Sequence, residues 1–151
     1  MTLRSQFLAT LSIEIAQSFE LGDTPAGRRR IDAFQRGTLQ GPRISGVILA
    51  GGSDALLRRA DGAYQPDVRL TIRTEDDELV YISYRGIRHG PPEVMARIAR
   101  DEPVAAEDYY LRNAPFFETA SERYDWLNRI VSVGVGRREP GKAIYEIYEI
   151  L

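Results

Sequence analysis

The residues best suited to chemistry in this chain are charged side chains that alternate with apolar ones along two neighbouring segments. In segment 67–73 the polar positions are Asp67, Arg69, Thr71 and Arg73, and apolar residues lie between them. Segment 79–85 repeats this alternation, and a period of two is typical of a half-buried β-strand. Arginine can bind a carboxylate or phosphate through two parallel hydrogen bonds. The polar face therefore predicts an anion-binding surface, provided that it faces a cavity and not solvent.

The two segments are predicted to pair as a hairpin. Apolar residues meet apolar ones if Leu70 lies opposite Ile82, and polar residues then meet as well, with Arg69 opposite Ser83. A shift by one residue would place polar side chains opposite apolar ones, which is unfavourable where one face is buried. This register is therefore our prediction for the hairpin.

A candidate site follows if the polar strand residues project into an enclosed interior. The candidate catalytic residues are Glu118 and Tyr81. The candidate substrate-binding residues are Arg69, Arg112, Trp126, Asn128, Arg43 and Asp54. In this hypothesis the two strand arginines Arg69 and Arg112 hold an anionic group, and Glu118 moves a proton because its phenylalanine neighbours leave it poorly solvated.

An alternative for the same residues is purely structural. Arg69 would then coat the outside of the sheet, since antiparallel sheets commonly turn polar side chains outwards. Asp54 would cap its own turn after Gly51 and Gly52. On the first hypothesis Arg69→Met abolishes ligand binding, and on the second it does not.

The composition excludes several classes of site. The chain has no cysteine and one histidine, His89, which argues against disulfides, a zinc site and a Ser-His-Asp triad. Neither a dinucleotide fingerprint nor a phosphate-binding loop occurs. The net charge of −2 argues against nucleic-acid partners. We expect no cofactor and no metal, and we expect a cytoplasmic protein without a signal peptide or membrane span.

The elements that must position these residues are mostly strands. Alternation, together with glycine and proline turns, predicts strands over 7–15, 30–39, 44–49, 55–59, 67–73, 79–85, 109–112, 116–119, 127–135 and 143–150. One short helix is expected near residues 91–100, where prolines and Glu93 precede an apolar stripe. Gly134 and Gly136 leave room on their strand for a ligand, for tyrosines of the last strand or for the helix.

These elements predict a single mainly-β domain over residues 1–151. About eight to ten short strands and one helix fit an antiparallel β-barrel. A small closed barrel is either filled with side chains or holds one small ligand. Charged side chains inside such a barrel must pair with each other, with water or with ligand.

Ordered motifs along the chain resemble a bacterial family known as domain of unknown function 3237. The motifs include Gly41-Pro42-Arg43, Gly51-Gly52-x-Asp54, Asp67-x-Arg69, Gly86-x-Arg88-x-Gly90-Pro91-Pro92-Glu93, Tyr109-Tyr110-x-Arg112 and Trp126-Leu127-Asn128. The resemblance implies a small β-barrel, self-association and no settled activity. This chain departs from the pattern at Ala55, where a tryptophan is common, and at Arg36 and Glu78, where glycine is usual.

Two functional hypotheses follow. In the first, the barrel binds a small organic acid or phenolic metabolite and catalyses a cofactor-free proton-transfer step of the isomerase, cyclase or lyase type. In the second, the protein is a non-catalytic binding or assembly module with a filled core. Both hypotheses predict a homo-oligomer.

Overall fold

The computed structural model describes residues 2–151, which form ten strands and three short helices. The strands are β1 (Ser5–Thr24), β2 (Gly27–Gln40), β3 (Ser45–Ile48), β4 (Ser53–Arg58), β5 (Tyr64–Gln65), β6 (Asp67–Thr74), β7 (Leu79–His89), β8 (Tyr110–Glu118), β9 (Ser132–Glu139) and β10 (Lys142–Ile150). The helices are α1 (Pro92–Ala99) and the 3-10 turns η1 (Ala106–Asp108) and η2 (Asp125–Arg129).

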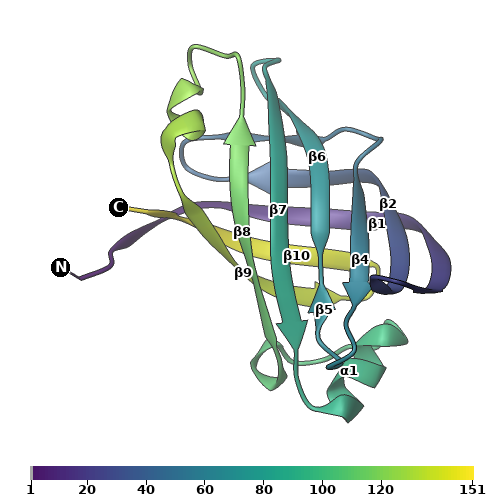
Figure 1. Ribbon diagram of the computed structural model, residues 1–151. Helices are drawn as coiled ribbons and strands as arrows, with labels where there is room; N and C mark the ends of the chain where they lie inside the picture. The colour runs from purple at the N-terminus through teal and green to yellow at the C-terminus, as the bar shows by residue number, and fades with distance from the viewer. Residues whose placement is uncertain (1) are drawn as a thin grey trace.

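The strands form one closed antiparallel barrel, as the sequence predicts. The sheet runs β1-β10-β9-β8-β7, and β7 pairs with both β5 and β6. Closure follows because β6 pairs with β3, β3 pairs with β2, and β2 pairs back with β1. Figure 1 shows β6, β7 and β8 crossing β1 and β10 at a steep angle. The two ends of the chain meet where the Leu151 amide donates to the Arg4 carbonyl.

The predicted register of the β6–β7 hairpin is confirmed. Leu70 lies opposite Ile82, and Arg69 lies opposite Ser83. The alternation of burial along β6 matches, since Val68, Leu70 and Ile72 are buried in the core. The polar residues of this hairpin therefore lie on its outer face.

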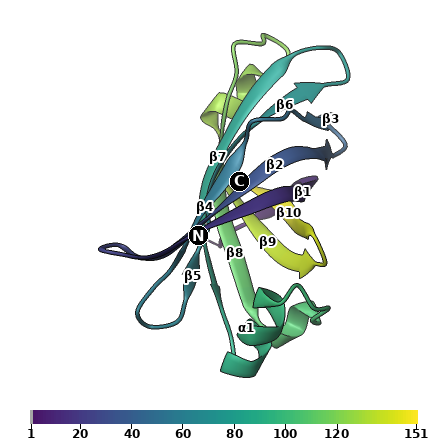
Figure 2. The same cartoon turned by 90° about the vertical axis from the view of Figure 1, so that its right-hand side faces the viewer.

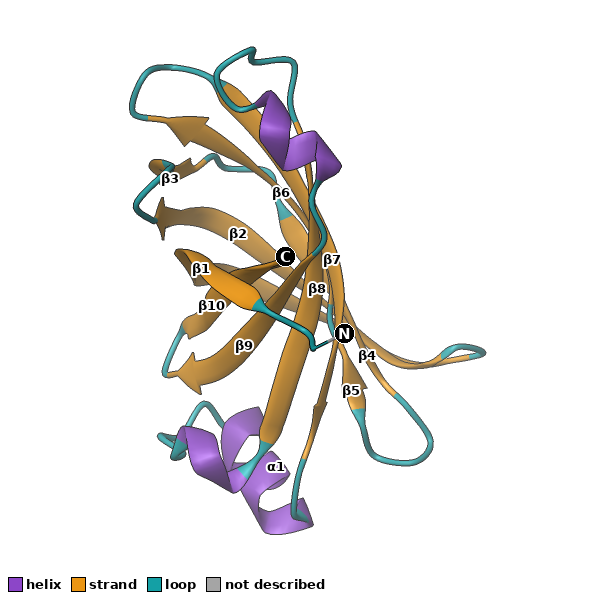
Figure 3. Cartoon of the chain, turned by 90° about the vertical axis from the view of Figure 1, so that its left-hand side faces the viewer, coloured by secondary structure: helices purple, strands orange, loops and turns teal. Residues whose placement is uncertain are grey.

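Short helices lie at opposite ends of the barrel. Figures 2 and 3 show α1 beside one end and η2 beside the other. Helix α1 begins after Pro91, carries Glu93 in its first turn and buries Met95 and Ile98 against the core. It lies within the predicted range of residues 91–100.

The predicted strand over residues 127–135 is wrong in its first half. Residues 125–129 form η2, and β9 begins at Ser132. Trp126 and Asn128 therefore lie outside β9, the strand that carries Gly134. The two strands predicted over 109–112 and 116–119 are one strand, β8.

Side chains from neighbouring strands fill the room beside the β9 glycines. A Cβ atom at Gly136 would lie 2.6 Å from both Leu111 Cγ and Tyr145 Cε1, and one at Gly134 would lie 1.9 Å from Asn113 Oδ1. Of the three occupants that the sequence allows, the tyrosine of the last strand is the one at Gly136.

We predict that Gly136→Ala destabilises the protein by about 1–3 kcal/mol, because the added methyl group must displace buried Leu111 or Tyr145. Urea denaturation measures the change. Val135→Ala, at an exposed neighbour on β9, is the matched control and should change stability far less. Equal stability of the Gly136 variant and wild type would contradict this packing.

Candidate active site inside the barrel

Two carboxyl groups lie side by side on the inner face of the barrel. Strands β2 and β4 pair antiparallel with Asp32 directly opposite Asp54. The same face carries Leu56 on β4 and Phe34 on β2, both buried. Like charges directly opposite each other in a sheet repel. Each aspartate therefore needs a partner or a proton.

Asp32 has cationic and hydroxyl partners. The Arg30 Nε atom lies 2.9 Å from Asp32 Oδ1, and Arg30 Nη2 donates to Oδ2 at 3.0 Å. The Ser18 hydroxyl on β1 donates to Oδ1 at 2.5 Å. Asp32 is therefore the carboxylate of a nearly buried, hydrogen-bonded ion pair.

Within residues 2–151 Asp54 has no arginine in salt-bridge contact, and its pKa is raised. Its Oδ1 accepts one hydrogen bond, from the Asp67 amide at 2.9 Å. Removal from water, reinforced by the negative charge of Asp32, raises the pKa of Asp54 from 3.8 to about 6. The residue as a whole is half-buried. An acid whose pKa lies near neutral pH can donate or accept a proton in catalysis.

Arg88 on β7 is a buried cation without a carboxylate in contact. Its exposed fraction is 4%, and its Nε has no hydrogen-bond partner within the described part of the chain. The guanidinium lies over the Tyr64 ring, 4.6 Å from the centroid. Burial, together with the positive charge of Arg138, lowers the pKa of Arg88. A guanidinium held in this way is suited to binding an anion.

Two tyrosines from opposite walls complete the cluster. The rings of Tyr84 on β7 and Tyr145 on β10 pack edge to face with centroids 5.3 Å apart, and both are buried. Burial raises the pKa of Tyr145 to about 12, and the nearby charge of Asp54 adds to the effect. Both phenols therefore stay protonated near neutral pH and can donate hydrogen bonds.

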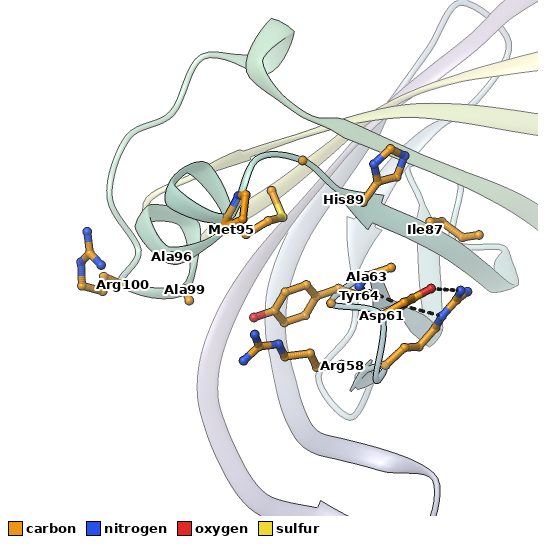
Figure 4. A pocket seen from close by; sticks show the side chains of 14 residues that line it. Arg58, Asp61, Ala63, Tyr64, Ile87, His89, Met95, Ala96, Ala99 and Arg100 are labelled. Atoms are coloured by element: carbon orange, nitrogen blue, oxygen red, sulfur yellow. Dashed lines mark hydrogen bonds and ion pairs between the residues drawn. The ribbon is translucent and has the colours of Figure 1, made fainter.

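Two hollows at the α1 end share Arg58, Tyr64 and Ala99. The smaller is a recess of about 200 Å³ that Arg30, Leu56 and Tyr64 line from the barrel side. The larger is a groove of about 810 Å³ between α1 and the loop that joins β4 to β5. Figure 4 shows Tyr64 and Arg58 below α1 in this groove, with His89 and Ile87 on its far side.

Most of the charged groups in the groove have ionic partners. Arg59 pairs with Asp61, and Arg100 donates to Glu102 at 2.7 Å. The recess, in contrast, shares Tyr64 with the Arg88 contact and Arg30 with the Asp32 ion pair of the inner cluster. We therefore regard the recess and the inner cluster as the candidate active site, and the groove as its approach.

The expected inward orientation of the strand residues does not hold for four of them. Arg69 is exposed and pairs with Asp67 at 3.1 Å. Tyr81 and Glu118 lie opposite each other on the outer face of β7 and β8. Arg112 also points outwards, with its guanidinium 4.8 Å from the centre of the Tyr110 ring. Residues on these faces alternate with buried ones, so the register that pairs the hairpin correctly also turns these side chains to solvent.

Three further candidates gather at the opposite end, near η2. Arg43 lies over the Trp126 ring at 4.1 Å and pairs with Glu149. Asn128 accepts from the Thr119 amide at 2.8 Å and donates to the Thr119 carbonyl at 3.0 Å, which fixes the end of β8. Of the eight predicted site residues, only Asp54 belongs to the inner cluster.

The other cluster residues were not predicted from the sequence, although the alternation along β7 indicates an inward position for Arg88. Continuing the β7 alternation past residue 85 places Ile82, Tyr84, Gly86 and Arg88 on one face. Asp32 follows the same rule with Phe34 on β2. The proximity of Tyr64, Arg138 and Tyr145 depends on closure of the barrel, which no local pattern specifies.

Residues 2–151 contain neither a cluster of metal-binding side chains nor a membrane-spanning helix. There, no group of three or more His, Cys, Asp and Glu side chains lies close enough together to hold a metal ion. None of the helices in the same range has the length and apolar character that crossing a membrane would require.

Comparisons with known proteins give a consistent assignment. The family model described as "Protein of unknown function (DUF3237)" matches residues 3–150. The UPF0311 protein RPA1785 of Rhodopseudomonas palustris is 30% identical over 150 residues, covering 99% of this chain and 98% of that one. Its crystal structure has a TM-score of 0.96 over 100% of this chain and 99% of that chain. A β-barrel-like protein of Acinetobacter baumannii is 33% identical with a TM-score of 0.87, covering 100% and 98% of the two chains.

A more distant relative is named for an enzymatic activity. A protein of Penicillium herquei named as a hydroalkoxylation enzyme is 23% identical over 129 residues, covering 85% of this chain and 71% of that one. A solved enzyme structure from the same fungus has a TM-score of 0.73 at 20% identity, covering 100% of this chain and 96% of that chain. That structural likeness establishes a shared fold.

We predict that Asp54→Asn stabilises the protein at high pH. The pKa of Asp54 is raised in the folded state, so its contribution to stability is present below pH 4 and is lost as the pH rises to about 6. Between pH 4 and pH 8 the free energy of unfolding of the variant should rise relative to wild type by about 1–3 kcal/mol. Urea denaturation at both pH values measures this difference.

Asp61→Asn is the control for this prediction. The hydrogen bond from Arg59 lowers the pKa of Asp61, so the pH dependence of its variant should have the opposite sign. The prediction is contradicted if ionisation of Asp54 increases the free energy of unfolding of the wild-type protein between pH 4 and pH 6. The pKa of this carboxyl group would then not be raised.

Proposed function

Because this chain belongs to the DUF3237 family, a relative of which is named as an enzyme, we propose that it is a cofactor-free proton-transfer catalyst. The substrate is a small organic acid or phenolic metabolite bound in the recess. The reaction is of the isomerase, cyclase or lyase type. Asp54 transfers the proton, Arg88 and Arg30 supply positive charge, and Tyr84 with Tyr145 shapes the pocket.

The observation that carries this proposal is the contrast between the two inner aspartates. Asp32 is paired with Arg30 and Ser18, whereas burial raises the pKa of Asp54 to about 6. A carboxyl group whose surroundings move its pKa towards neutral pH is typical of acid–base sites. Asp54 also sits where Leu56 and the inner tyrosines exclude most water, which strengthens its electrostatic interactions with a bound substrate.

Hydroalkoxylation, the activity named for the Penicillium herquei relative, is one reaction that such a site can perform. A hydroxyl oxygen forms a bond to one alkene carbon while the alkene π bond breaks. Asp54 donates a proton to the other alkene carbon and regains one from the reacting hydroxyl group, so no oxidant, reductant or metal is needed. General acid–base catalysis of this kind contributes about 10²–10⁴-fold to a rate.

We predict that Asp54→Asn lowers turnover by about 10²-fold or more, since the amide cannot transfer the proton. The probe is 2-allylphenol, whose hydroxyl group can add to its own double bond, tested alongside alkenyl carboxylic acids. Mass spectrometry in D₂O detects the cyclic ether with one deuterium on carbon. The rate should fall as the pH rises through about 6, where Asp54 loses its proton.

Glu118→Gln is the matched control, because Glu118 is a carboxylate on the outer face that sequence reasoning alone favours as the acid. It should retain wild-type turnover. Loss of activity in the Glu118 variant with full activity in the Asp54 variant would transfer the site to the outer face. Tight binding of the probes without any turnover would favour the non-catalytic alternative.

We also propose that the protein forms a homo-oligomer through an apolar strip on the outside of the barrel. Phe116 on β8 and Val133 and Val135 on β9 are each at least 41% exposed, and Val131 precedes them. Apolar surface gathered on neighbouring strands is typical of subunit contacts.

We predict that Val133→Glu lowers the oligomeric mass, because a charge would be buried in the contact. Light scattering after size exclusion measures the mass. Leu79→Glu, at an exposed apolar residue of β7, is the control and should leave the mass unchanged. A Val133 variant with wild-type mass would exclude this strip as the interface.

A further inference from the structure

We propose that the recess beside Tyr64 binds a small organic monoanion whose negative group pairs with Arg88, and that its binding places a proton on Asp54. This inference rests on the proposed function for the role of Asp54. The binding step stands apart from it, because an anion can bind whether or not a reaction follows.

The charges on the inner face of the barrel favour an anion beside Arg88. Arg30 is matched by Asp32, and Arg138 lies 3.5 Å from Asp101 at the rim. Arg88 has no carboxylate within salt-bridge distance in residues 2–151 and depends on the Tyr64 ring and the more distant Asp54. When Asp54 is protonated, one positive charge is therefore left uncompensated inside the barrel. A single negative charge on the ligand would neutralise it.

Several buried polar atoms have no hydrogen-bond partner among residues 2–151. They include the Nε atoms of Arg88 and Arg138 and the side-chain oxygen and nitrogen of Asn113. Arg88 and Asn113 are 4% and 5% exposed. Leaving such groups unsatisfied is costly, and native proteins retain few of them without a reason. Arg88 and Asn113 come from paired strands, β7 and β8, so their polar atoms belong to one region of the inner face.

The shape of the recess indicates what kind of anion fits. Its volume of about 200 Å³ suits a small molecule. Its walls combine the Tyr64 ring and Leu56 with charged side chains, namely Glu20, Arg28, Arg30 and Arg58. The Arg88 guanidinium, stacked on the same tyrosine, presents a planar set of donors that matches a carboxylate. An aromatic carboxylate combines a flat apolar body with one negative group, so benzoate is the simplest probe.

The coupling to Asp54 follows from its surroundings. The charged and titratable groups that face it are Asp32 and Arg30 on β2, Arg88 and Tyr84 on β7, and Tyr145 on β10, besides the Asp67 amide. Arg88 favours the ionised form of Asp54. An anion paired with Arg88 cancels that effect and adds its own repulsion, so both changes favour the protonated acid. The bound substrate thus prepares its own proton donor.

The first experiment compares benzoate with its neutral isostere benzamide by calorimetry and ligand-detected NMR. Benzoate should bind wild-type protein at least about tenfold more tightly than benzamide. Arg88→Met should remove this preference while keeping the fold, because replacing an unpaired buried charge with an apolar side chain is often neutral or stabilising. Arg88→Lys, which keeps the charge but loses the planar donors, should give an intermediate affinity.

Two outer arginines serve as matched controls. Arg85 lies on the same strand as Arg88 with its side chain 77% exposed, and Arg69 is the anion anchor that sequence reasoning favours. Arg85→Met and Arg69→Met should bind benzoate like wild type. Equal affinity for benzoate and benzamide, or loss of binding in the Arg69 variant but not in the Arg88 variant, would overturn the proposal.

The second experiment measures protons. Benzoate binding at pH 7, followed by calorimetry in buffers of different ionisation enthalpy, should take up protons to a limit of about one per ligand. Asp54→Asn should still bind benzoate but take up none. Anion-selective binding through Arg88 without proton uptake, or with the same uptake in the Asp54 variant, would remove Asp54 from the proposal.

The two experiments separate failure of this inference from failure of the proposed function. Benzoate binding with coupled protonation, but no turnover of any probe, would leave the anion site standing and exclude catalysis of the tested reactions. Turnover that depends on Asp54 but not on Arg88 would support catalysis and refute the anion site.

Discussion

The register between β2 and β4 places two aspartates in contact range on a surface with little water, and the properties of the interior follow from that placement. With Asp32 opposite Asp54, ionisation of both carboxyl groups is unfavourable. Arg30 and Ser18 bind Asp32, while burial and the charge of Asp32 raise the pKa of Asp54 to about 6. A slip of one residue would turn both aspartates to the other face of the sheet and remove the effect.

The barrel separates the residues that stabilise it from those that carry charge. Apolar side chains from β1, β6 and β7 fill the middle, including Leu11, Ile72 and Ile82, none of which is measurably exposed. Arg88 lies nearer the end of β7 that leads to α1, and there it meets Tyr64 and Arg138. An ionic cluster of this kind contributes little or negatively to stability, since desolvation offsets the Coulombic attraction. Its presence beside a well-packed core is the pattern expected of a binding site.

The sequence was sufficient to predict the fold but misplaced most of the site. Alternation identified the β6–β7 hairpin and its register, because a half-buried strand leaves a local signal at every residue. The same signal placed Arg69 on the face opposite Leu70, and the structure shows that this face is exposed. Residues 127–129 were assigned to a strand because η2 is a single short turn with no cap or periodicity to reveal it. Asp54 alone was found, since its glycine-rich turn pointed to close backbone approach, whereas Arg88 lay three residues past the predicted end of its strand.

Access to Asp54 depends on how differently the two ends of the barrel are closed. At the η2 end, Leu127 is 1% exposed, and the Tyr124 hydroxyl donates to Asp76 at 2.7 Å, which ties the turn to the β6–β7 loop. At the α1 end, small residues line the hollows: Gly62 and Ala63 on the loop, and Ala96 and Ala99 on the helix. Small side chains there leave the space that larger ones would fill, and the Tyr64 ring that lines both hollows also packs against the Arg88 guanidinium. The helix side is therefore the end from which the proposed ligand would reach Arg88.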